Sequence, residues 1–188
     1  MKRRLFIALN LADDIKDDIE SVLKGIPLPR QFGLRPVARE NWHITVLFLG
    51  DQEEEDIPKI EAAMNAAVRK RNAPAPHGKL RDLTYGPVGA RPHMIWVNTS
   101  RDASDGIGYL KRLIEAELAK EEIGWEEKDR EKFDGHVTLA RFNQTPLRSL
   151  PRLQKPLNFE FTAPTLDLVA SELRRGGPKY ATLDKIAF

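Results

Sequence analysis

The 188-residue sequence contains no cysteine, which excludes disulfides, thiolate nucleophiles, zinc fingers and iron–sulfur centres. It has no Gly-x-x-x-x-Gly-Lys-Ser/Thr loop and no Gly-x-Gly-x-x-Gly fingerprint, so nothing predicts ATP or dinucleotide chemistry. No set of His, Asp and Glu residues has the helical spacing of metal ligands, and we expect neither metal nor cofactor. The longest apolar runs are far shorter than the roughly 20 residues that cross a bilayer, so we expect no membrane partner.

The first residues imitate the start of a signal peptide, because three basic side chains precede the apolar run Leu5–Leu9. Asn10 interrupts that run, however, and four aspartates follow without a small-residue cleavage site. We therefore expect a buried first strand rather than a targeting segment. A cysteine-free chain of this kind is expected in the cytoplasm.

Charge of one sign is also scarce, since the formal net charge is only +2. The distribution is uneven: residues 101–140 carry 7 basic and 11 acidic side chains, and residues 141–188 carry 8 basic and 4 acidic ones. The C-terminal quarter therefore either faces a phosphate-bearing ligand or is an ordinary solvated surface. Counting alone leaves both interpretations open.

Apolar spacing predicts an α+β chain. Three segments have helical period: one from about Asp13 to Gly25, one that begins near Asp56, and one with its stripe over Leu110–Leu118 that stops by Gly124. The remaining apolar runs are short, with Pro and Gly between them, as is typical of strands. The expected strands are Leu5–Leu9, Leu34–Val37, His43–Leu49, Leu80–Tyr85, Met94–Asn98, His136–Phe142, Leu157–Phe161, Leu166–Glu172 and Tyr180–Ile186.

A four-residue motif occurs twice. His43-Ile44-Thr45-Val46 returns as His136-Val137-Thr138-Leu139, 93 residues later and about half the chain away. Each copy opens a strand-like run and has a helical segment some distance before it. The repeat predicts one bilobal domain over residues 1–188, with two similar α+β lobes that each bring one motif strand to a shared cleft.

Strand geometry places a histidine and a threonine of each motif on one face. Side chains alternate along a strand, so His43 and Thr45 point one way while Ile44, Val46 and Phe48 point into a core. His136 and Thr138 share a face in the same manner. Two histidines can serve as general acid and general base at phosphorus, and the threonine hydroxyls can donate to phosphate oxygens without a metal. The other two histidines, His77 and His93, follow prolines and have no matching threonine, so we expect them in loops or on the surface.

The two motif blocks resemble those of the 2H phosphoesterase superfamily. Residues 35–50 (RPVARENWHITVLFLG) and residues 136–141 (HVTLAR) are most similar to the RNA 2′,3′-cyclic phosphodiesterases, also called 2′-5′ RNA ligases or LigT-like proteins. The opening strand and the closing segments 171–173 and 177–180 support the resemblance. It implies a bilobal fold with antiparallel sheets, outer helices and a pseudo-twofold axis. It also implies hydrolysis of an RNA 2′,3′-cyclic phosphate end to a 2′-phosphate.

The resemblance also implies roles for individual residues. His43 would protonate the departing O3′, His136 would activate water, and Thr45 and Thr138 would hold the phosphate. Family members often carry an arginine at the position of Arg141, where a guanidinium suits phosphate oxygens. Arg141 lies five residues after His136, so in a regular strand it would point away from the cleft, and both a ligand contact and a structural role remain open.

The run from Arg174 to Tyr180 combines charge, glycine and one aromatic ring. It is either an RNA contact, with Tyr180 stacking on a base, or a hairpin turn with solvated arginines. The same catalytic site also fits reversible 2′-5′ RNA ligation or cleavage of a small cyclic nucleotide. An RNA-binding module without turnover is a further alternative, although binding alone does not need two titrating groups. We expect a monomer that acts on RNA ends or nucleotides with a 2′,3′-cyclic phosphate.

Overall fold

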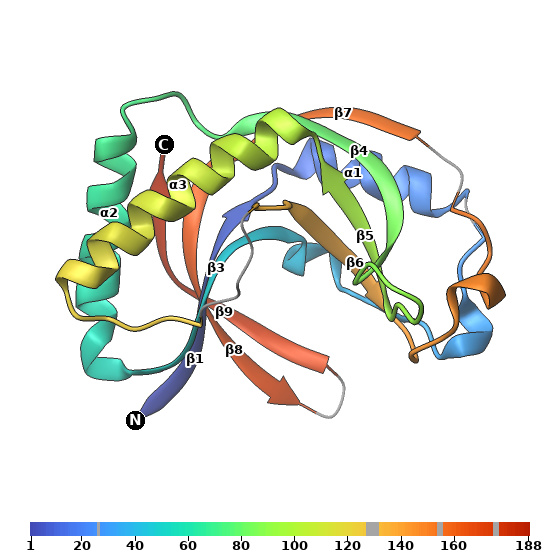
Figure 1. Ribbon diagram of the computed structural model, residues 1–188, viewed down its shortest axis with the longest axis horizontal. Helices are drawn as coiled ribbons and strands as arrows, with labels where there is room; N and C mark the ends of the chain where they lie inside the picture. The colour runs from blue at the N-terminus through green and yellow to red at the C-terminus, as the bar shows by residue number, and fades with distance from the viewer. Residues whose placement is uncertain (26, 127–131, 154–155, 175–176) are drawn as a thin grey trace.

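The computed structural model describes residues 1–25, 27–126, 132–153, 156–174 and 177–188. Three α-helices and nine strands lie in these ranges, together with four short 3-10 turns (Figure 1). In chain order they are β1 (Lys2–Asn10), α1 (Asp13–Leu23), η1 (Arg30–Phe32), β2 (Arg35–Pro36), η2 (Arg39–Asn41), β3 (His43–Glu53), η3 (Glu54–Asp56), α2 (Ile57–Arg71), β4 (His77–Gly86), β5 (Met94–Thr99), α3 (Arg101–Lys120), β6 (His136–Arg141), η4 (Leu147–Ser149), β7 (Pro156–Thr162), β8 (Thr165–Arg174) and β9 (Gly177–Ala187).

The strands form an antiparallel sheet in the order β7-β4-β5-β6-β3-β1-β8-β9, and β2 pairs with β6. The order divides into two four-stranded halves, one ending on β6 and the other on β3. The halves meet through one pair of residues, Ile44 opposite Val137, and both of these side chains are fully buried. The two motif strands are therefore neighbours at the centre of the molecule.

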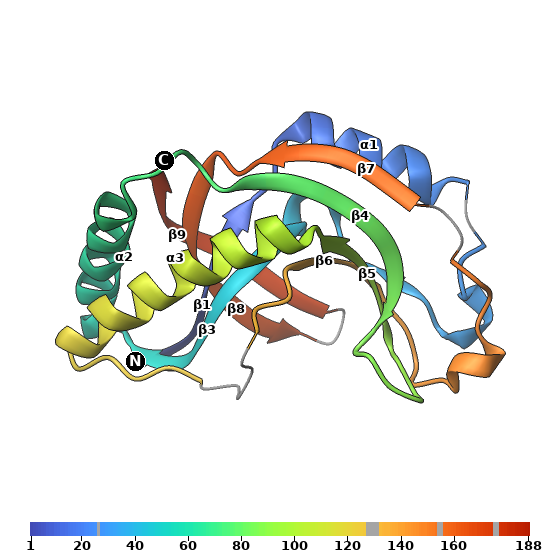
Figure 2. The ribbon, with the colours of Figure 1, turned by 45° about the horizontal axis from the view of Figure 1, so that its top comes forward.

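The helices cover the two halves unequally (Figure 2). α1 packs behind β7, α2 packs beside β9, and α3 packs against α2 and reaches both halves through β3 and β4. Each helix places an apolar stripe in the core, through Ile15 and Ile19 on α1, Met64 on α2, and Leu110 and Ile114 on α3. In the part of the chain that the structure describes, no helix is long and apolar enough to cross a membrane.

The predicted α+β fold with antiparallel strands is confirmed, and the differences are local. The third helix begins at Arg101, before the predicted apolar stripe. Its first turns carry mainly polar and small residues, so the apolar spacing did not indicate them. Only Arg35–Pro36 of the expected strand Leu34–Val37 is extended, paired with the end of β6. His77 begins a strand rather than a loop, although its side chain is exposed as expected.

A second repeat supports the pseudo-twofold relation. In β1, Phe6–Asn10 runs beside β3 so that Asn10 lies opposite His43; in β5, Met94–Asn98 runs beside β6 so that Asn98 lies opposite His136. The two segments are 88 residues apart, and a helix begins three residues after each asparagine. Each lobe therefore repeats a strand, a helix and a motif strand in the same order.

Candidate active site

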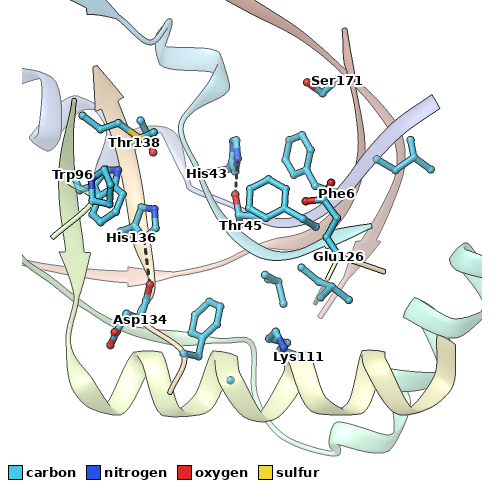
Figure 3. Close-up of a pocket in the computed structure, with 18 of the residues that line it drawn as sticks. Phe6, His43, Thr45, Trp96, Lys111, Glu126, Asp134, His136, Thr138 and Ser171 are labelled. Atoms are coloured by element: carbon cyan, nitrogen blue, oxygen red, sulfur yellow. Dashed lines mark hydrogen bonds between the residues drawn. The ribbon is translucent and has the colours of Figure 1, made fainter. Parts of the chain in front are cut away.

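The junction between the two halves brings the motif side chains to one face of the sheet. Extending the antiparallel register from Ile44 and Val137 by one residue places His43 opposite Thr138 and Thr45 opposite His136. All four side chains are half-buried and line a cleft of about 510 Å³ between the sheet and α3 (Figure 3). Each histidine thus has its own threonine along the strand and the other motif's threonine across it.

Both imidazoles are held in the same orientation by the backbone. His43 Nδ1 lies 2.7 Å from the Asn41 carbonyl oxygen, and His136 Nδ1 lies 3.2 Å from the Asp134 carbonyl oxygen. A carbonyl oxygen only accepts, so Nδ1 carries the proton in each ring and Nε2 is the nitrogen without one. In the free protein the Thr45 hydroxyl donates to His43 Nε2 across 3.2 Å. Figure 3 shows the His136–Asp134 and His43–Thr45 contacts as dashed lines.

Aromatic side chains fix the planes of the two rings. Phe6 stacks on His43 with centroids 5.0 Å apart, and Tyr180 meets His43 edge-on at 5.6 Å. Trp96 stacks on His136 at 3.9 Å (Figure 3). Held by carbonyls at one edge and by aromatic rings against their faces, the imidazoles have little freedom to turn. Because the rings are already fixed before substrate binds, they do not have to be oriented during proton transfer.

The surroundings of His43 disfavour its charged form. Burial lowers the pKa of His43 to about 4, and positive charge from His136, Lys16 and Arg141 acts in the same direction. The hydrogen bond to the Asn41 carbonyl opposes the effect without cancelling it. His43 is therefore a neutral imidazole at pH 7 in the free protein.

Two β-bulges decide which residues follow the motifs into the cleft. In the β1–β3 pairing the register shifts so that Val46 has no partner, and in the β5–β6 pairing it shifts so that Leu139 has none. A bulge adds one residue and reverses the alternation of the faces. Arg141 therefore lines the cleft after all. Phe48, which we expected in the core, is 36% exposed and lines the cleft instead.

Among the residues that the structure describes, Arg141 has no acidic partner. Its Nη1 contacts the Met94 sulfur at 3.6 Å, and within the described ranges no carboxylate lies at ion-pair distance from it. The equivalent position in the other lobe is Phe48, since both lie five residues after a motif histidine. The motif residues are thus related by symmetry, while the next cleft position is cationic in one lobe and aromatic in the other.

Tyr180 lies where the closing hairpin meets the cleft, beside Phe6 and next to Ser171 in the β8–β9 pairing. Arg175 and Gly176 of the same run lie outside the described residues. Sequence reasoning missed Phe6 and Trp96. Their signal was the second repeat, whose two segments flank the motif strands.

The far wall of the cleft is polar. Lys111 and Glu115 on α3 form an ion pair there, and Arg4 contacts Glu126 at 3.4 Å. Among the residues that the structure describes, no three His, Asp or Glu side chains are grouped to hold a metal ion. Chemistry without a metal or cofactor stays a prediction.

Known proteins resemble this chain in sequence. A sequence model of the family described as LigT like Phosphoesterase matches residues 9–76. The Aeropyrum pernix protein named RNA 2′,3′-cyclic phosphodiesterase is 30% identical over 170 residues, which cover 86% of this chain and 87% of that protein. The chain belongs to the LigT-like phosphoesterase family. The resemblance that the two motif blocks predicted is therefore confirmed.

Other LigT-like proteins match over nearly the whole chain. A Thermus thermophilus relative named RNA 2′,3′-cyclic phosphodiesterase is 29% identical over 98% of this chain and 89% of its own length. The solved structure of Escherichia coli LigT complexed with 3′-AMP is 26% identical and superposes with a TM-score of 0.70, covering 100% of this chain and 98% of that one. The superposed part of this chain includes both motif strands.

Proposed function

We propose that this LigT-like phosphoesterase hydrolyses the 2′,3′-cyclic phosphate at the end of an RNA chain and leaves a 2′-phosphate. The observation that carries the proposal is the pair of equivalent His-x-Thr motifs, which meet at Ile44–Val137 and present two imidazoles to one cleft. The relatives that match most of the chain are named for this activity. In this proposal the partner is therefore an RNA end.

The two histidines would divide the proton transfers. His136 Nε2 takes a proton from water as the water oxygen bonds to phosphorus, and His43 Nε2 gives a proton to O3′ as the P–O3′ bond breaks. O2′ keeps the phosphate. This division follows the resemblance to the family, because the two motifs are related by symmetry and their hydrogen bonds alone do not choose.

The proposed acid must gain its proton when the substrate binds. His43 is neutral in the free protein, but a cyclic phosphate carries a negative charge, and an anion within about 4–6 Å raises the pKa of a histidine. His43 would thus become the imidazolium in the complex. The same arrival would release the Thr45 hydroxyl from His43 Nε2, so that it can donate to a phosphate oxygen.

The remaining cleft residues would hold the phosphate and the nucleoside. Thr45 and Thr138 supply hydroxyl donors on opposite sides of the junction, and Arg141 supplies the guanidinium. The aromatic group around His43, formed by Phe6, Phe48 and Tyr180, offers ring faces and edges to a base or ribose.

The test is hydrolysis of a short RNA that ends in a 2′,3′-cyclic phosphate, with EDTA present. Wild type should produce a 2′-phosphate in EDTA, while His43→Ala and His136→Ala should each lose roughly 10²–10⁴ in kcat. His77→Ala is the matched control, since His77 is exposed and does not line the cleft.

Three outcomes would count against the proposal. Loss of wild-type activity in EDTA would point to a metal. A 3′-phosphate product would show that the P–O2′ bond breaks instead of the P–O3′ bond. RNA binding without turnover would favour the binding-module alternative.

A further inference from the structure

The pseudo-twofold relation places one buried polar residue at the same point of two helices. Lys16 is the fourth residue of α1 and Ser104 is the fourth residue of α3, and each helix begins three residues after an asparagine that lies opposite a motif histidine. Both side chains are buried, with 6% of Lys16 and 3% of Ser104 exposed. Lys16 and Ser104 therefore occupy equivalent positions of the repeat, but only Lys16 carries a charge.

Each of these residues supports the strand end next to a motif histidine. Ser104 Oγ contacts Thr99 Oγ1 at 2.7 Å and accepts from the Gly135 backbone N–H at 3.1 Å, immediately before His136. Lys16 Nζ donates to Asn10 Oδ1 at 3.2 Å, and Asn10 lies opposite His43 in the β1–β3 register. The support near His136 is therefore neutral, whereas the support near His43 is a buried ammonium.

The charge of Lys16 is only partly balanced by its neighbours. Burial disfavours the charged form of Lys16, and so do Arg39 at the start of η2 and Lys185 on β9. Asp13 on α1 and Asp167 on β8 favour the charged form. In the described chain no carboxylate lies within ion-pair distance of its Nζ. Asp167 is itself buried and accepts a hydrogen bond from the Thr165 hydroxyl.

His43 has basic side chains around it on several elements. Lys16 on α1 and Arg141 and His136 on β6 all act on it, and the Tyr180 ring on β9 meets it edge-on. Arg141 and His136 line the cleft, so they would contact the substrate once it is bound. Lys16 does not line the cleft, so its charge persists whether or not substrate is present.

We propose that Lys16 is a positioning residue that breaks the electrostatic symmetry of the site, and that its charge adds to the burial that keeps His43 neutral until an anion enters the cleft. The catalytic consequence rests on the proposed function: the acid is charged only when a phosphate is there to use its proton. The electrostatic part concerns the free protein and stands without any turnover.

The test follows the imidazole resonances of His43 through a pH titration by NMR, without substrate. Removing the buried charge in Lys16→Gln, which keeps an amide donor, should raise the pKa of His43 by roughly half a pH unit. Lys16→Arg, which keeps the charge, should leave the His43 titration close to that of wild type. Lys185→Gln is the control, because Lys185 is exposed and its charge is screened by solvent.

Two results would overturn the proposal: an unchanged His43 titration in Lys16→Gln, or an equal change in Lys16→Arg, which would assign the effect to packing. Lys16→Met is the second charge-free variant, used where a buried amide prevents folding, and the same spectra report whether each variant folds. The titration needs no activity. A protein that fails to hydrolyse cyclic phosphate but shows the predicted change would contradict the proposed function and leave the role of Lys16 in place.

Discussion

A side chain at Gly86 would collide with an aromatic ring of the site. A Cβ at this position would lie 2.3–2.4 Å from three carbons of the Trp96 indole, where carbon atoms normally approach to about 3.5–4.0 Å. The indole cannot retreat freely, because its other face stacks on His136 at 3.9 Å. Gly86→Ala should therefore push Trp96 toward His136. Overpacking of this kind costs roughly 1–3 kcal/mol of unfolding free energy.

That cost corresponds to a Tm lower by roughly 2–12 °C for a chain of this length. Displacing His136 by about 1 Å should lower kcat on the cyclic-phosphate RNA by up to roughly 10²-fold. Thermal unfolding and steady-state kinetics measure the two effects. Gly106→Ala is the matched control, because its Cβ meets nothing within 4 Å and alanine favours the interior of α3.

Replacing Trp96 with Phe in the Gly86→Ala background should restore part of the Tm, since the smaller ring leaves room for the methyl group. A Gly86→Ala protein with wild-type Tm and kcat would refute the account of how His136 is held.

Three further predictions concern the site. Because burial lowers the pKa of His43 below its unfolded value, the unfolded state binds more protons between about pH 4 and 6.5. The unfolding free energy should fall by up to about 3 kcal/mol as the pH drops through this window, and denaturant titrations should show a smaller fall for His43→Gln. Arg141→Met should reduce kcat/KM by roughly 10–150-fold through loss of a charged hydrogen bond, whereas Arg35→Met, on the neighbouring strand outside the cleft, should have little effect. Thr138→Val keeps the shape and removes one donor, so kcat should fall by roughly 10²-fold with the Tm nearly unchanged.

The motif histidines and threonines were predictable because they depend only on the alternation of side chains along a strand. His43 and Thr45 need two residues of regular extended backbone, and the structure provides them in both motifs. The positions beyond the motifs depend on the bulges, which add one residue without a distinctive sequence signal. The prediction for Phe48 was therefore wrong, and Arg141 could not be assigned to a face.

The arrangement of the lobes was predictable only in part. The repeat of His-x-Thr indicated two lobes and a shared cleft, and the resemblance of the long motif blocks supported the same fold. It did not show that the two sheets join through Ile44 and Val137, because strand order depends on contacts distant in sequence. The weaker repeat of Phe6–Asn10 in Met94–Asn98 escaped notice because only Ile and Asn are identical between the copies.

In the proposed reaction, two symmetry-related histidines divide the acid and base work. The most direct test is an RNA whose cyclic phosphate has sulfur in place of the bridging O3′. A thiol has a pKa near 8.5, so a thiolate leaves without needing a proton from the enzyme. His43→Ala should recover most of its lost kcat on this substrate, while His136→Ala, which lacks the base, should remain slow. Recovery of His136→Ala instead would reverse the two roles, and recovery of neither would contradict the division of labour.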